Sequence, residues 1–404
     1  MAMPLEGIRV IDWTIWQQGP VCSAMLGDLG AEVIKIEERV GGDPGRGIIK
    51  MSGADMGDRP NFYFEANNRN KKSLTLDLNQ PEAREIIYGL VAKSDVFVQN
   101  FRKGVAARLG IDYATLRKHN EKLIYASATG YGPDGPSSAE PSFDQLGLAR
   151  SGIMMAAGEP DMPPLAIAGG VADQMGAVVL AYGILAALIA RDRHGIGQEV
   201  DTSHLSAMMW LQGLNLSCKL MMGFQMGRQF RSQAGNPLWN HYCCKDDQWL
   251  CLGMLQSDRY WADFCRVLDR PALIDDERFA DMAARGQNAK ECVAELDEAF
   301  RQRTRDEWID IFNHSEGDFI LTIVNSVDDL PEDPQVVGND YIVDFDHPSH
   351  GPIKMQGMPV ALRETPGQIR TAAPEFGQHT EEVLLDVLGY DWDKITKLRE
   401  SEVI

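Results

Sequence analysis

The stretch IRVIDWTIWQQGPVCSAMLGDLGAEVIKIE (residues 8–37) holds the pattern that decides the fold. It opens with a short apolar run of strand type at 8–12 and continues through a helical segment that ends near Gly30. It closes on a second apolar run at 31–37. A strand, a helix and a strand in this order predict a parallel βαβ unit whose strands are covered by helices.

The same alternation continues along the chain. Further strand-type runs occupy 73–78, 95–100 and 123–130, and they are separated by helical segments, one of which begins at Pro81. The longest apolar helix is expected at about 174–190, followed by a strand in GIGQEVDTSHL (195–205) and a Met-rich helix at 205–222. We therefore expect an α/β fold with a doubly wound parallel sheet, whose ligands bind at the C-terminal ends of the strands.

The alternation of strand-type runs and helical segments ends at about residue 225. HYCCKDDQWLCLGML (241–255) has the pattern of a hairpin, and amphipathic helices are expected at 257–267, 288–302 and 304–313. A chain of 404 residues exceeds the usual size of one hydrophobic core. We therefore expect a second domain between about 225 and 325.

Composition limits the class of protein. The formal net charge of −20 argues against a nucleic-acid partner, and without a run of about 18 apolar residues no membrane span is expected. The seven cysteines lack the spacing of a disulfide framework or a zinc site, which favours reduced thiols in a cytoplasmic protein and no metal. Residues 1–120 hold 16 Lys and Arg against 15 Asp and Glu, so an anionic ligand suits this near-neutral third best.

One carboxylate stands apart in AGGVADQMGAVVLAYG (168–183). Asp173 follows two glycines and opens the long apolar helix. It can be an N-cap, or it can be a nucleophile that the helix dipole keeps ionised, with Gly169 and Gly170 allowing a ligand to approach the backbone. The sequence leaves both interpretations open. Ser203 and His204 adjoin without a GxSxG elbow, and we interpret them as structural.

Several segments, in order along nearly the whole chain, resemble the class III CoA-transferases. They are QGPVCSAMLGDLGAEVIKIE, NRNKKSLTLDL, DVFVQNFRKGVAARLGI, GGVADQMGA, GIGQEVD and APEFGQHTEEVL. That family includes formyl-CoA and carnitine CoA-transferases, and the alpha-methylacyl-CoA racemases are its relatives. The resemblance implies a Rossmann-like large domain from 1–224 and 329–404, with a small α+β domain inserted at 225–328. It also implies an interlocked dimer, formed with a second copy or a paralogous subunit.

The implied chemistry uses acyl-CoA as a substrate and no metal. By this resemblance Asp173 attacks the donor thioester to give a mixed anhydride, and the CoA thiolate returns to form an aspartyl-CoA thioester. The acceptor carboxylate then attacks, and CoA passes to it. Positions that match the family's CoA contacts are Gln17, Gln18, Leu76, Asn79, Asn100, Phe101, Arg102, Arg108 and Leu109. Glu38 stands where formyl-CoA enzymes place an arginine, and Arg39 is the candidate substitute.

Three alternatives follow from the resemblance. The racemases pair the aspartate with a histidine, and this chain has Phe143 at that position, which favours a transferase because racemisation needs two proton carriers. Asp144 matches an acidic residue that supports the active site of the transferases, and Gln145 is the next candidate. The third alternative, a non-catalytic CoA-binding subunit, should lack Asp173.

The acceptor acid is expected to be larger than oxalate. The glycine run that closes over oxalate in formyl-CoA enzymes is missing between 225 and 260, where Trp239, His241 and Tyr242 predict a bulkier aromatic lid. The Met-rich helix fits either an adaptable apolar surface or plain core packing. Arylsuccinates with succinyl-CoA as donor are one acceptor class of this kind, and a carnitine-like acid is the alternative.

Overall fold

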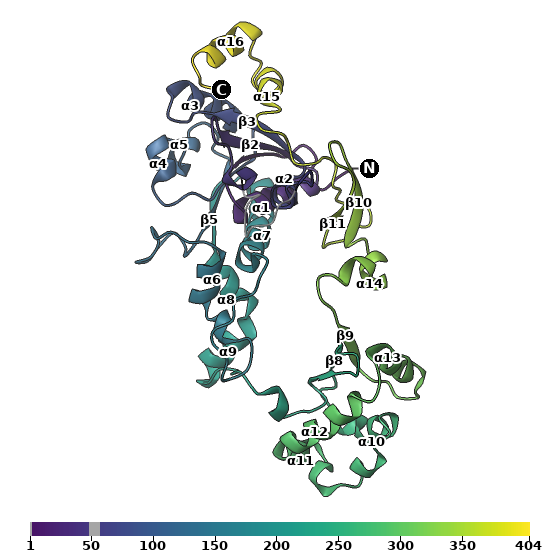
Figure 1. Cartoon of the computed structure of the whole chain (residues 1–404). Helices are drawn as coiled ribbons and strands as arrows, with labels where there is room; N and C mark the ends of the chain where they lie inside the picture. Colours follow the sequence, from purple (N-terminus) through teal and green to yellow (C-terminus); the bar gives the residue numbers. More distant parts are fainter. Residues whose placement is uncertain (1, 48–56) are drawn as a thin grey trace. The chain divides into compact units, whose positions relative to one another are not determined.

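The computed structural model describes residues 2–47 and 57–404, which divide into two units (Figure 1). Unit 1 comprises Met1–Met154, Ala166–Gln225 and Pro334–Ile404. Unit 2 comprises Met155–Leu165 and Met226–Asp333. The chain thus leaves unit 1 and returns to it, and its last seventy or so residues belong to the same unit as the first strand.

A six-stranded parallel sheet forms the centre of unit 1. Its strands, in chain order, are β1 (Arg9–Trp13), β2 (Glu32–Glu38), β3 (Lys71–Leu76), β4 (Val96–Gln99), β5 (Ile124–Thr129) and β6 (Gln198–Ser203). The spatial order β3-β2-β1-β4-β5-β6 confirms the predicted parallel sheet. The order reverses between β1 and β4, and a ligand crevice is expected at the C-terminal ends of these two strands.

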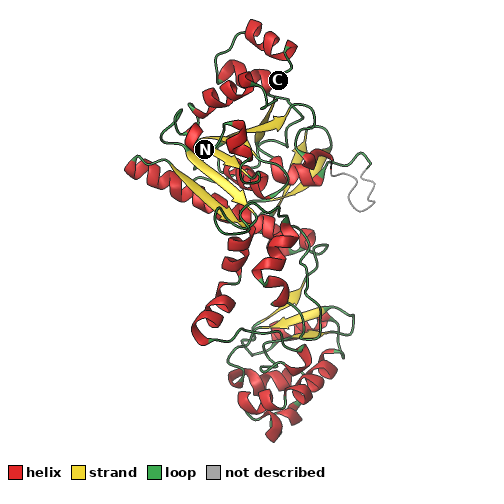
Figure 2. Ribbon diagram, turned by 90° about the vertical axis from the view of Figure 1, so that its left-hand side faces the viewer, coloured by secondary structure: helices red, strands yellow, loops and turns green. Residues whose placement is uncertain are grey.

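Both faces of the sheet are buried, which explains the near-continuous apolar runs. Val10 packs in one core with α1 (Gln18–Asp28) and α7 (Val171–His194), whereas the next residue, Ile11, packs in the other with α3 (Pro81–Val91) and α15 (Thr380–Asp386). Figure 2 shows helices on either side of these strands. Unit 1 also contains the helices α2 (Phe62–Asn68), α4 (Val105–Leu109), α5 (Tyr113–Leu116), α6 (Asp144–Ser151), α14 (Pro334–Val337) and α16 (Trp392–Glu400), besides the Met-rich segment.

The Met-rich segment differs from the expectation. It forms two helices, α8 (His204–Leu211) and α9 (Gly213–Met222), which meet at Gln212, the C-cap of one and the N-cap of the other. Trp210 is 78% exposed and Met221 is 81% exposed. Plain core packing therefore holds only for part of α8, where Met208 is fully buried, and the rest of this pair of helices presents apolar side chains to its surroundings.

Helix α7 is long and apolar enough to cross a membrane by length and composition alone, with a hydropathy of 1.7 over its most apolar window. Its uninterrupted apolar run, at 175–190 between Gln174 and Arg191, is shorter than the about 18 residues expected of a membrane span. Its side chains Leu180 and Ile184 are fully buried against α1 and the sheet. The fold thus uses α7 as a core helix, and a core helix passes the same test of length and composition.

The C-terminal segment protects the edge of the sheet at β3. His379 donates its backbone N–H to the carbonyl of Ser73 at 3.0 Å, and its Nδ1 accepts the backbone N–H of Ser73 at 3.2 Å. The N–H of Thr75 is bound by the hydroxyl of Thr380 at 3.3 Å. Figure 1 shows α15 and α16 beside this strand, preceded by the antiparallel hairpin β10 (Ile342–His347) and β11 (Gly351–Gln356). These contacts satisfy donors that an edge strand would otherwise expose.

The bond from Ser73 to His379 makes stability depend on pH. Burial of His379 holds the pKa of its imidazole below the ordinary 6.5, and the nearby charge of Lys72 lowers this pKa further. The unfolded chain therefore takes up the proton first as the pH falls, so this contribution is full above pH 6.5 and is lost below it. His379→Gln keeps a hydrogen-bond acceptor but does not titrate. When the pH is lowered from 7.5 to 5.5, we expect the Tm of this variant to fall by about 1–3 °C less than the Tm of the wild type. Equal losses in parallel thermal melts would contradict this.

Unit 2 holds a small antiparallel sheet and a helical layer. The sheet order is β7-β8-β9, and the strands are β7 (His241–Cys243), β8 (Trp249–Leu252) and β9 (Leu321–Val324). The predicted hairpin and amphipathic helices are present; the helices are α10 (Asp258–Val267), α11 (Met282–Gln287), α12 (Ala289–Phe300) and α13 (Arg305–His314). Phe264, Phe300 and Phe312 form a buried aromatic core.

Tyr242 belongs to that core and not to a lid. It is fully buried, donates its hydroxyl to the carbonyl of Pro237 at 2.7 Å and stacks on Phe300. The prediction of a lid residue at this position is wrong, because residue 242 lies on the inward face of β7. Trp239 is 57% exposed.

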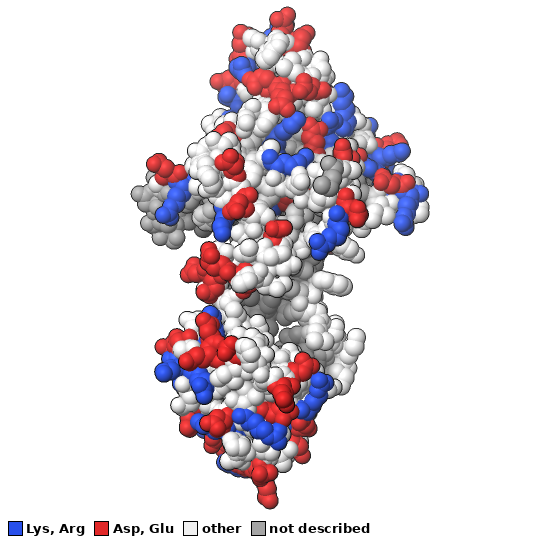
Figure 3. Space-filling model, turned by 90° about the vertical axis from the view of Figure 1, so that its right-hand side faces the viewer, with Lys and Arg blue, Asp and Glu red and all other residues white. Residues whose placement is uncertain are grey.

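On the face shown in Figure 3, acidic and basic side chains are interspersed, unlike the basic surface of a nucleic-acid-binding protein.

Candidate active site

The start of α7 is capped by a side chain from another helix. Gly170 is the N-cap residue in the left-handed region (φ 68°), and Asp173 lies in the first turn without capping it. The carboxylate oxygen Oδ1 of Asp144, at the start of α6, accepts the backbone N–H groups of Ala172 at 2.6 Å and Asp173 at 3.1 Å. The interpretation of Asp173 as an N-cap is therefore wrong, since Asp144 performs that function and leaves the Asp173 side chain available.

The carboxylate of Asp173 meets an imidazole that the sequence did not connect with it. Oδ1 of Asp173 lies 2.8 Å from Nε2 of His204, and the two side chains are 18% and 6% exposed. The purely structural interpretation of His204 needs correction, because its ring touches this carboxylate. The hydrogen bonds that the described residues make with the Asp173 carboxylate go to Oδ1, which leaves Oδ2 to whatever enters the site.

Asp173 and His204 border a cavity of about 670 Å³ at the C-terminal ends of β1, β4 and β5. Predicted site residues from four separate segments meet there, together with aromatic side chains that carry no charge. The lining includes Gln17, Gln18, Asn100, Phe101, Arg102, Asp144, Trp16, Tyr63 and Phe143. The position agrees with the crevice expected where the strand order reverses.

Two glutamines at the start of α1 face the first turn of α7. A Cβ on Gly170 would lie 2.5 Å from Oε1 of Gln17, and one on Gly176 would lie 2.4 Å from Nε2 of Gln18. A larger residue at either position would push the glutamine amide away from α7. Gln18 is 4% exposed, and its Nε2 has no hydrogen-bond partner among the described residues. A buried donor of this kind is costly to leave unpaired and is suited to a ligand oxygen.

Asn100 supports the site through the loop after β1. Its amide accepts the backbone N–H of Ile15 at 2.9 Å and donates to the carbonyl of the same residue at 2.7 Å. Trp16, the next residue, has a positive φ of 65° and donates its N–H to Asp43 at 3.1 Å. The loop is therefore held in a conformation that a bulky residue seldom adopts, and the hydrogen bonds of Asn100 help to stabilise it.

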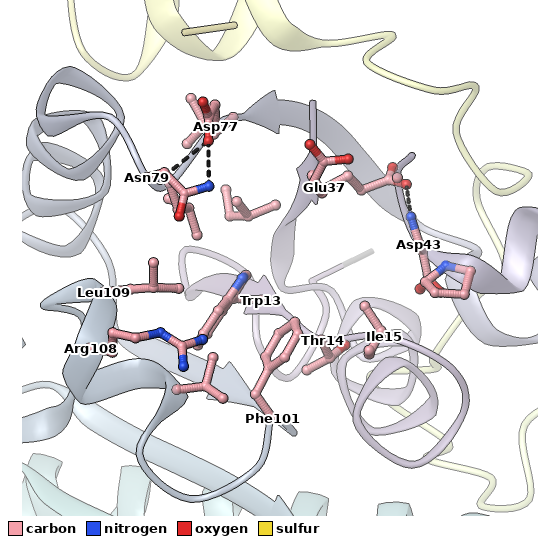
Figure 4. Close-up of a pocket in the computed structure, with 17 residues that line it drawn as sticks. Trp13, Thr14, Ile15, Glu37, Asp43, Asp77, Asn79, Phe101, Arg108 and Leu109 are labelled. Carbon is pink, nitrogen blue, oxygen red and sulfur yellow. Dashed lines mark hydrogen bonds between the residues drawn. The ribbon is translucent and has the colours of Figure 1, made fainter. Parts of the chain in front are cut away.

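A second cavity, of about 290 Å³, adjoins the first (Figure 4). The two share the lining residues Ile15, Phe101 and Val105, so they form one groove, which we call the β1–β4 groove. The second cavity brings together the predicted residues Leu76, Asn79, Arg108 and Leu109. Figure 4 shows Trp13 and Phe101 lying along its floor with the Arg108 side chain beside them, and these two rings stack at 4.0 Å.

Two arginine side chains line the β1–β4 groove. Arg102 and Arg108 are exposed and form no ion pair with the described residues. Of the four acidic groups that line the second cavity, Glu37 pairs with Arg46 at 2.7 Å and Asp43 pairs with Lys35 at 2.8 Å. The other two, Glu38 and Asp77, accept backbone N–H groups of their own loops. The free positive charges can therefore meet an anionic ligand at both cavities.

Two predicted residues lie outside the groove. Arg39 forms an ion pair with Glu402 at 3.2 Å and lines neither cavity, whereas Glu38, the residue in the arginine position, lines the second one. Gln145 is exposed on α6 and lines neither cavity, because consecutive residues of a helix point in different directions.

Tyr63, on α2, is a site residue that sequence reasoning missed. Its burial and then the nearby charge of Asp173 raise the pKa of the phenol well above its ordinary value, so the hydroxyl keeps its proton. It lines the same cavity as Asp173, from a position 110 residues earlier in the chain. No local pattern around Tyr63 signals this approach.

The capping function of Asp144 predicts a paired effect. Asp144→Ala removes two hydrogen bonds from the start of α7, and we expect a loss of about 1–2 kcal/mol in the free energy of unfolding by urea titration. Turnover should fall with it, because the same backbone carries Asp173. Asp144→Asn should restore most of the stability, since Asn caps as well as Asp. Gln145→Ala is the control and should leave both quantities unchanged.

Comparison with known proteins identifies the family of the chain. The sequence model described as CoA-transferase family III matches residues 5–380. The chain is 32% identical to (R)-2-hydroxy-4-methylpentanoate CoA-transferase of Clostridioides difficile over 100% of both chains. It is also 32% identical to succinyl-CoA:glutarate CoA-transferase of Mus musculus, over 99% of this chain and 90% of the relative.

A solved structure has the same fold over most of its length. A CAIB/BAIF family protein from Brucella suis superposes with a TM-score of 0.84 at 28% identity, covering 96% of this chain and 100% of that one. The resemblance found in the sequence motifs is thereby confirmed, and the curated relatives that match over the full length are named as CoA-transferases. This chain belongs to CoA-transferase family III and is a CoA-transferase.

Proposed function

We propose that this enzyme moves CoA from an acyl-CoA donor to a carboxylic acid in the cytoplasm, with Asp173 as the nucleophile. Oδ2 of Asp173 attacks the donor thioester and expels CoA thiolate, giving a mixed anhydride. The thiolate then attacks Cγ of Asp173 and expels the donor acid, giving an aspartyl-CoA thioester. The acceptor carboxylate attacks this thioester, and the thiolate finally takes the acceptor acyl group and frees Asp173. Each step exchanges one acyl derivative for another, so no energy source is needed.

The observation that carries this proposal is the state of the Asp173 carboxylate. One oxygen is held by His204, and the other has no hydrogen-bond partner among the residues that the structure describes; Asp173 itself lines the cavity. The carboxylate lies in the first turn of α7, at the positive end of the helix macrodipole. A nucleophile needs this combination of fixed orientation and one free oxygen.

The β1–β4 groove supports CoA as the ligand. Its two cavities give an extended binding surface, with Asp173 lining the first cavity and Arg108 lining the second. CoA combines phosphates with an adenine and a long pantetheine arm, which fits unpaired arginines and the stacked rings of Trp13 and Phe101. We propose that the adenosine lies near Leu76 and the thioester at Asp173. In this arrangement Asn100 positions the loop, and Arg39 makes no direct contact.

The acceptor is proposed to be larger than oxalate and at least partly apolar. Trp16, Tyr63 and Phe143 line the cavity beside Asp173, and the rings of Trp16 and Phe143 meet edge to face at 6.1 Å. Relatives are named for a branched hydroxy acid and for glutarate, both larger than oxalate. An aromatic acid such as an arylsuccinate, with succinyl-CoA as donor, is the acceptor that these rings favour most.

The arrangement of His204 favours transfer over racemisation. A racemase needs proton carriers on opposite faces of the alpha carbon. Here the imidazole binds Asp173 itself, and Phe143 occupies the position at which the racemases place a histidine.

We also propose that the active enzyme is an interlocked dimer with a Rossmann-like large domain. The exposed apolar side chains of α8 and α9, here called the α8–α9 face, support a subunit interface, since monomers rarely expose so much apolar surface. This face consists of Trp210, Leu211, Leu214, Leu220, Met221 and Met222.

A label-transfer screen tests the proposed function. The purified chain is incubated with a panel of acyl-CoAs and deuterated carboxylic acids, and new thioesters are read by mass spectrometry. We expect labelled aromatic acyl-CoA with a succinyl donor, and no exchange of the alpha hydrogen with solvent deuterium. Exchange of that hydrogen without label transfer would favour the racemase, and no turnover by the chain alone would favour a non-catalytic subunit.

The proposed CoA site can be tested in the second cavity. Because Arg108 lines that cavity, whereas Asp173 lines the first, and because Arg108 has no ion pair with the described residues, Arg108→Ala should raise the KM for acyl-CoA about tenfold with little change in kcat. The effect should shrink at high salt. Lys118→Ala, an exposed lysine outside the groove, is the matched control. An unchanged KM in Arg108→Ala would place the phosphates elsewhere.

A further inference from the structure

The contact between His204 and Asp173 is built from both sides. Ser203 caps α8 by accepting the backbone N–H of Ser206 at 3.0 Å, and the Ser206 hydroxyl accepts the N–H of Ser203 at 3.1 Å. This capping box fixes His204 at the first position of the helix. On the other side, Asp144 holds the backbone of Asp173. Two independent sets of hydrogen bonds therefore position the imidazole against the carboxylate.

The surroundings of His204 make the position specific for this ring. A Cβ on Gly147 would lie 2.4 Å from Cβ of His204, so glycine alone allows α6 to pass this close. The residue is 4% exposed. Such burial is expensive for a polar side chain unless its nitrogens are used.

The proton on His204 can be located by its partners. An ionised carboxylate accepts hydrogen bonds and cannot donate them, so the 2.8 Å contact requires a proton on Nε2. The hydroxyl of Ser142 lies 3.4 Å from Nδ1 and also 3.4 Å from the carbonyl of Phe143, and its one proton can go to either acceptor. In the neutral imidazole the contact with the carboxylate therefore makes Nε2 the donor and leaves Nδ1 as the acceptor.

This donor is aimed at an atom that changes charge during the proposed reaction. In the anhydride and in the aspartyl-CoA thioester, Oδ1 is the carbonyl oxygen of the acylated Asp173. When thiolate attacks Cγ, the new C–S bond forms and the carbonyl electron pair moves to Oδ1. Collapse of this intermediate restores the carbonyl and breaks the bond from Cγ to Oδ2, which leaves with the donor acid. The attack of the acceptor carboxylate on the thioester places the same charge on Oδ1.

We propose that Nε2–H of His204 is the oxyanion donor for the two steps in which Cγ of Asp173 is attacked. This inference rests on the proposed function and assigns a catalytic role to a residue outside the family-derived site. The donor already touches Oδ1 in the resting enzyme, so no reorganisation is needed as the charge develops. The other two steps place the negative charge on the oxygen of the donor or acceptor acyl group, which His204 does not contact.

Variants at position 204 separate this role from simple packing. His204→Phe keeps a flat ring but has no donor, and His204→Gln can present an amide N–H near the position of Nε2. We expect kcat of His204→Phe to fall about 10²–10³-fold, as for loss of an oxyanion donor, with KM changed less than threefold. His204→Gln should recover about tenfold or more of that loss. His204→Leu replaces His204→Phe if the latter does not fold, and Tm is measured for each variant.

Rapid quenching identifies the affected step. With donor acyl-CoA alone, mass spectrometry of the GGVADQMGA peptide follows the anhydride and the CoA adduct at Asp173. We expect the His204→Phe enzyme to form the CoA adduct about 10²–10³ times more slowly than the wild type, while the anhydride precedes it. Wild-type adduct rates in a folded His204→Phe enzyme, or equal losses in His204→Gln, would overturn the inference. Failure of the wild type to form any adduct at Asp173 would instead overturn the proposed function.

Discussion

Asp173→Asn should abolish turnover while leaving the fold intact. The amide has nearly the shape of the carboxylate, and its Oδ1 can still accept the hydrogen bond from His204. The amide is not a nucleophile, however, so kcat should fall by about 10³–10⁶-fold, as when an enzyme loses its covalent nucleophile. Since Asp173 does not cap α7, the substitution should change Tm by no more than about 2 °C.

The matched control lies on the same helix. Asp192→Asn removes an exposed carboxylate at the far end of α7, which pairs there with Arg191, and should leave turnover unchanged. Wild-type enzyme incubated with acyl-CoA should carry a covalent adduct on GGVADQMGA, and Asp173→Asn should carry none while still binding CoA in a calorimeter. An active Asp173→Asn enzyme, or an adduct on another peptide, would end the assignment of the nucleophile.

The sheet could be predicted from the sequence because its signal is local. Strand runs such as 8–12 and 31–37 are apolar on both faces, and only a sheet covered on both sides explains them. Helix boundaries were less predictable. The Met-rich segment reads as one helix, and its break at Gln212 arises where the backbone of that residue leaves the helical region (φ −99°, ψ 31°). Apolar content in a helix also does not tell a core from an exposed face, as Trp210 illustrates.

The positions of the site were predicted better than their functions. Motifs brought Asp173, Asp144 and the glutamines to attention, and the fold gathers them around one cavity. The sequence could not show that Asp144 caps α7, because the two residues that it binds are 28 and 29 positions away. His204 was missed for the same reason, since its distance from Asp173 depends on how α8 leaves β6.

The dimer is the second large effect to test, and the α8–α9 face is where to test it. Leu214 and Met221 are 75% and 81% exposed, and they lie seven residues apart, two turns along the same side of a helix. Burying such side chains against a partner contributes about 1.5–3 kcal/mol each. We expect the wild type to have twice its chain mass of 44.8 kDa in light scattering.

Two charges on this face should remove the dimer and, with it, the fold. In the Leu214→Glu, Met221→Glu double variant, each carboxylate would be buried without a partner at the interface, which is strongly unfavourable. If the subunits are threaded through one another, the separated chain has no complete structure to adopt, so the variant should be unfolded by circular dichroism and inactive. Val327→Glu, which replaces another apolar side chain (82% exposed) in unit 2, should remain dimeric and active. A folded monomer of the double variant would show that the subunits pack side by side without interlocking, and a monomeric, active wild type would contradict the dimer itself.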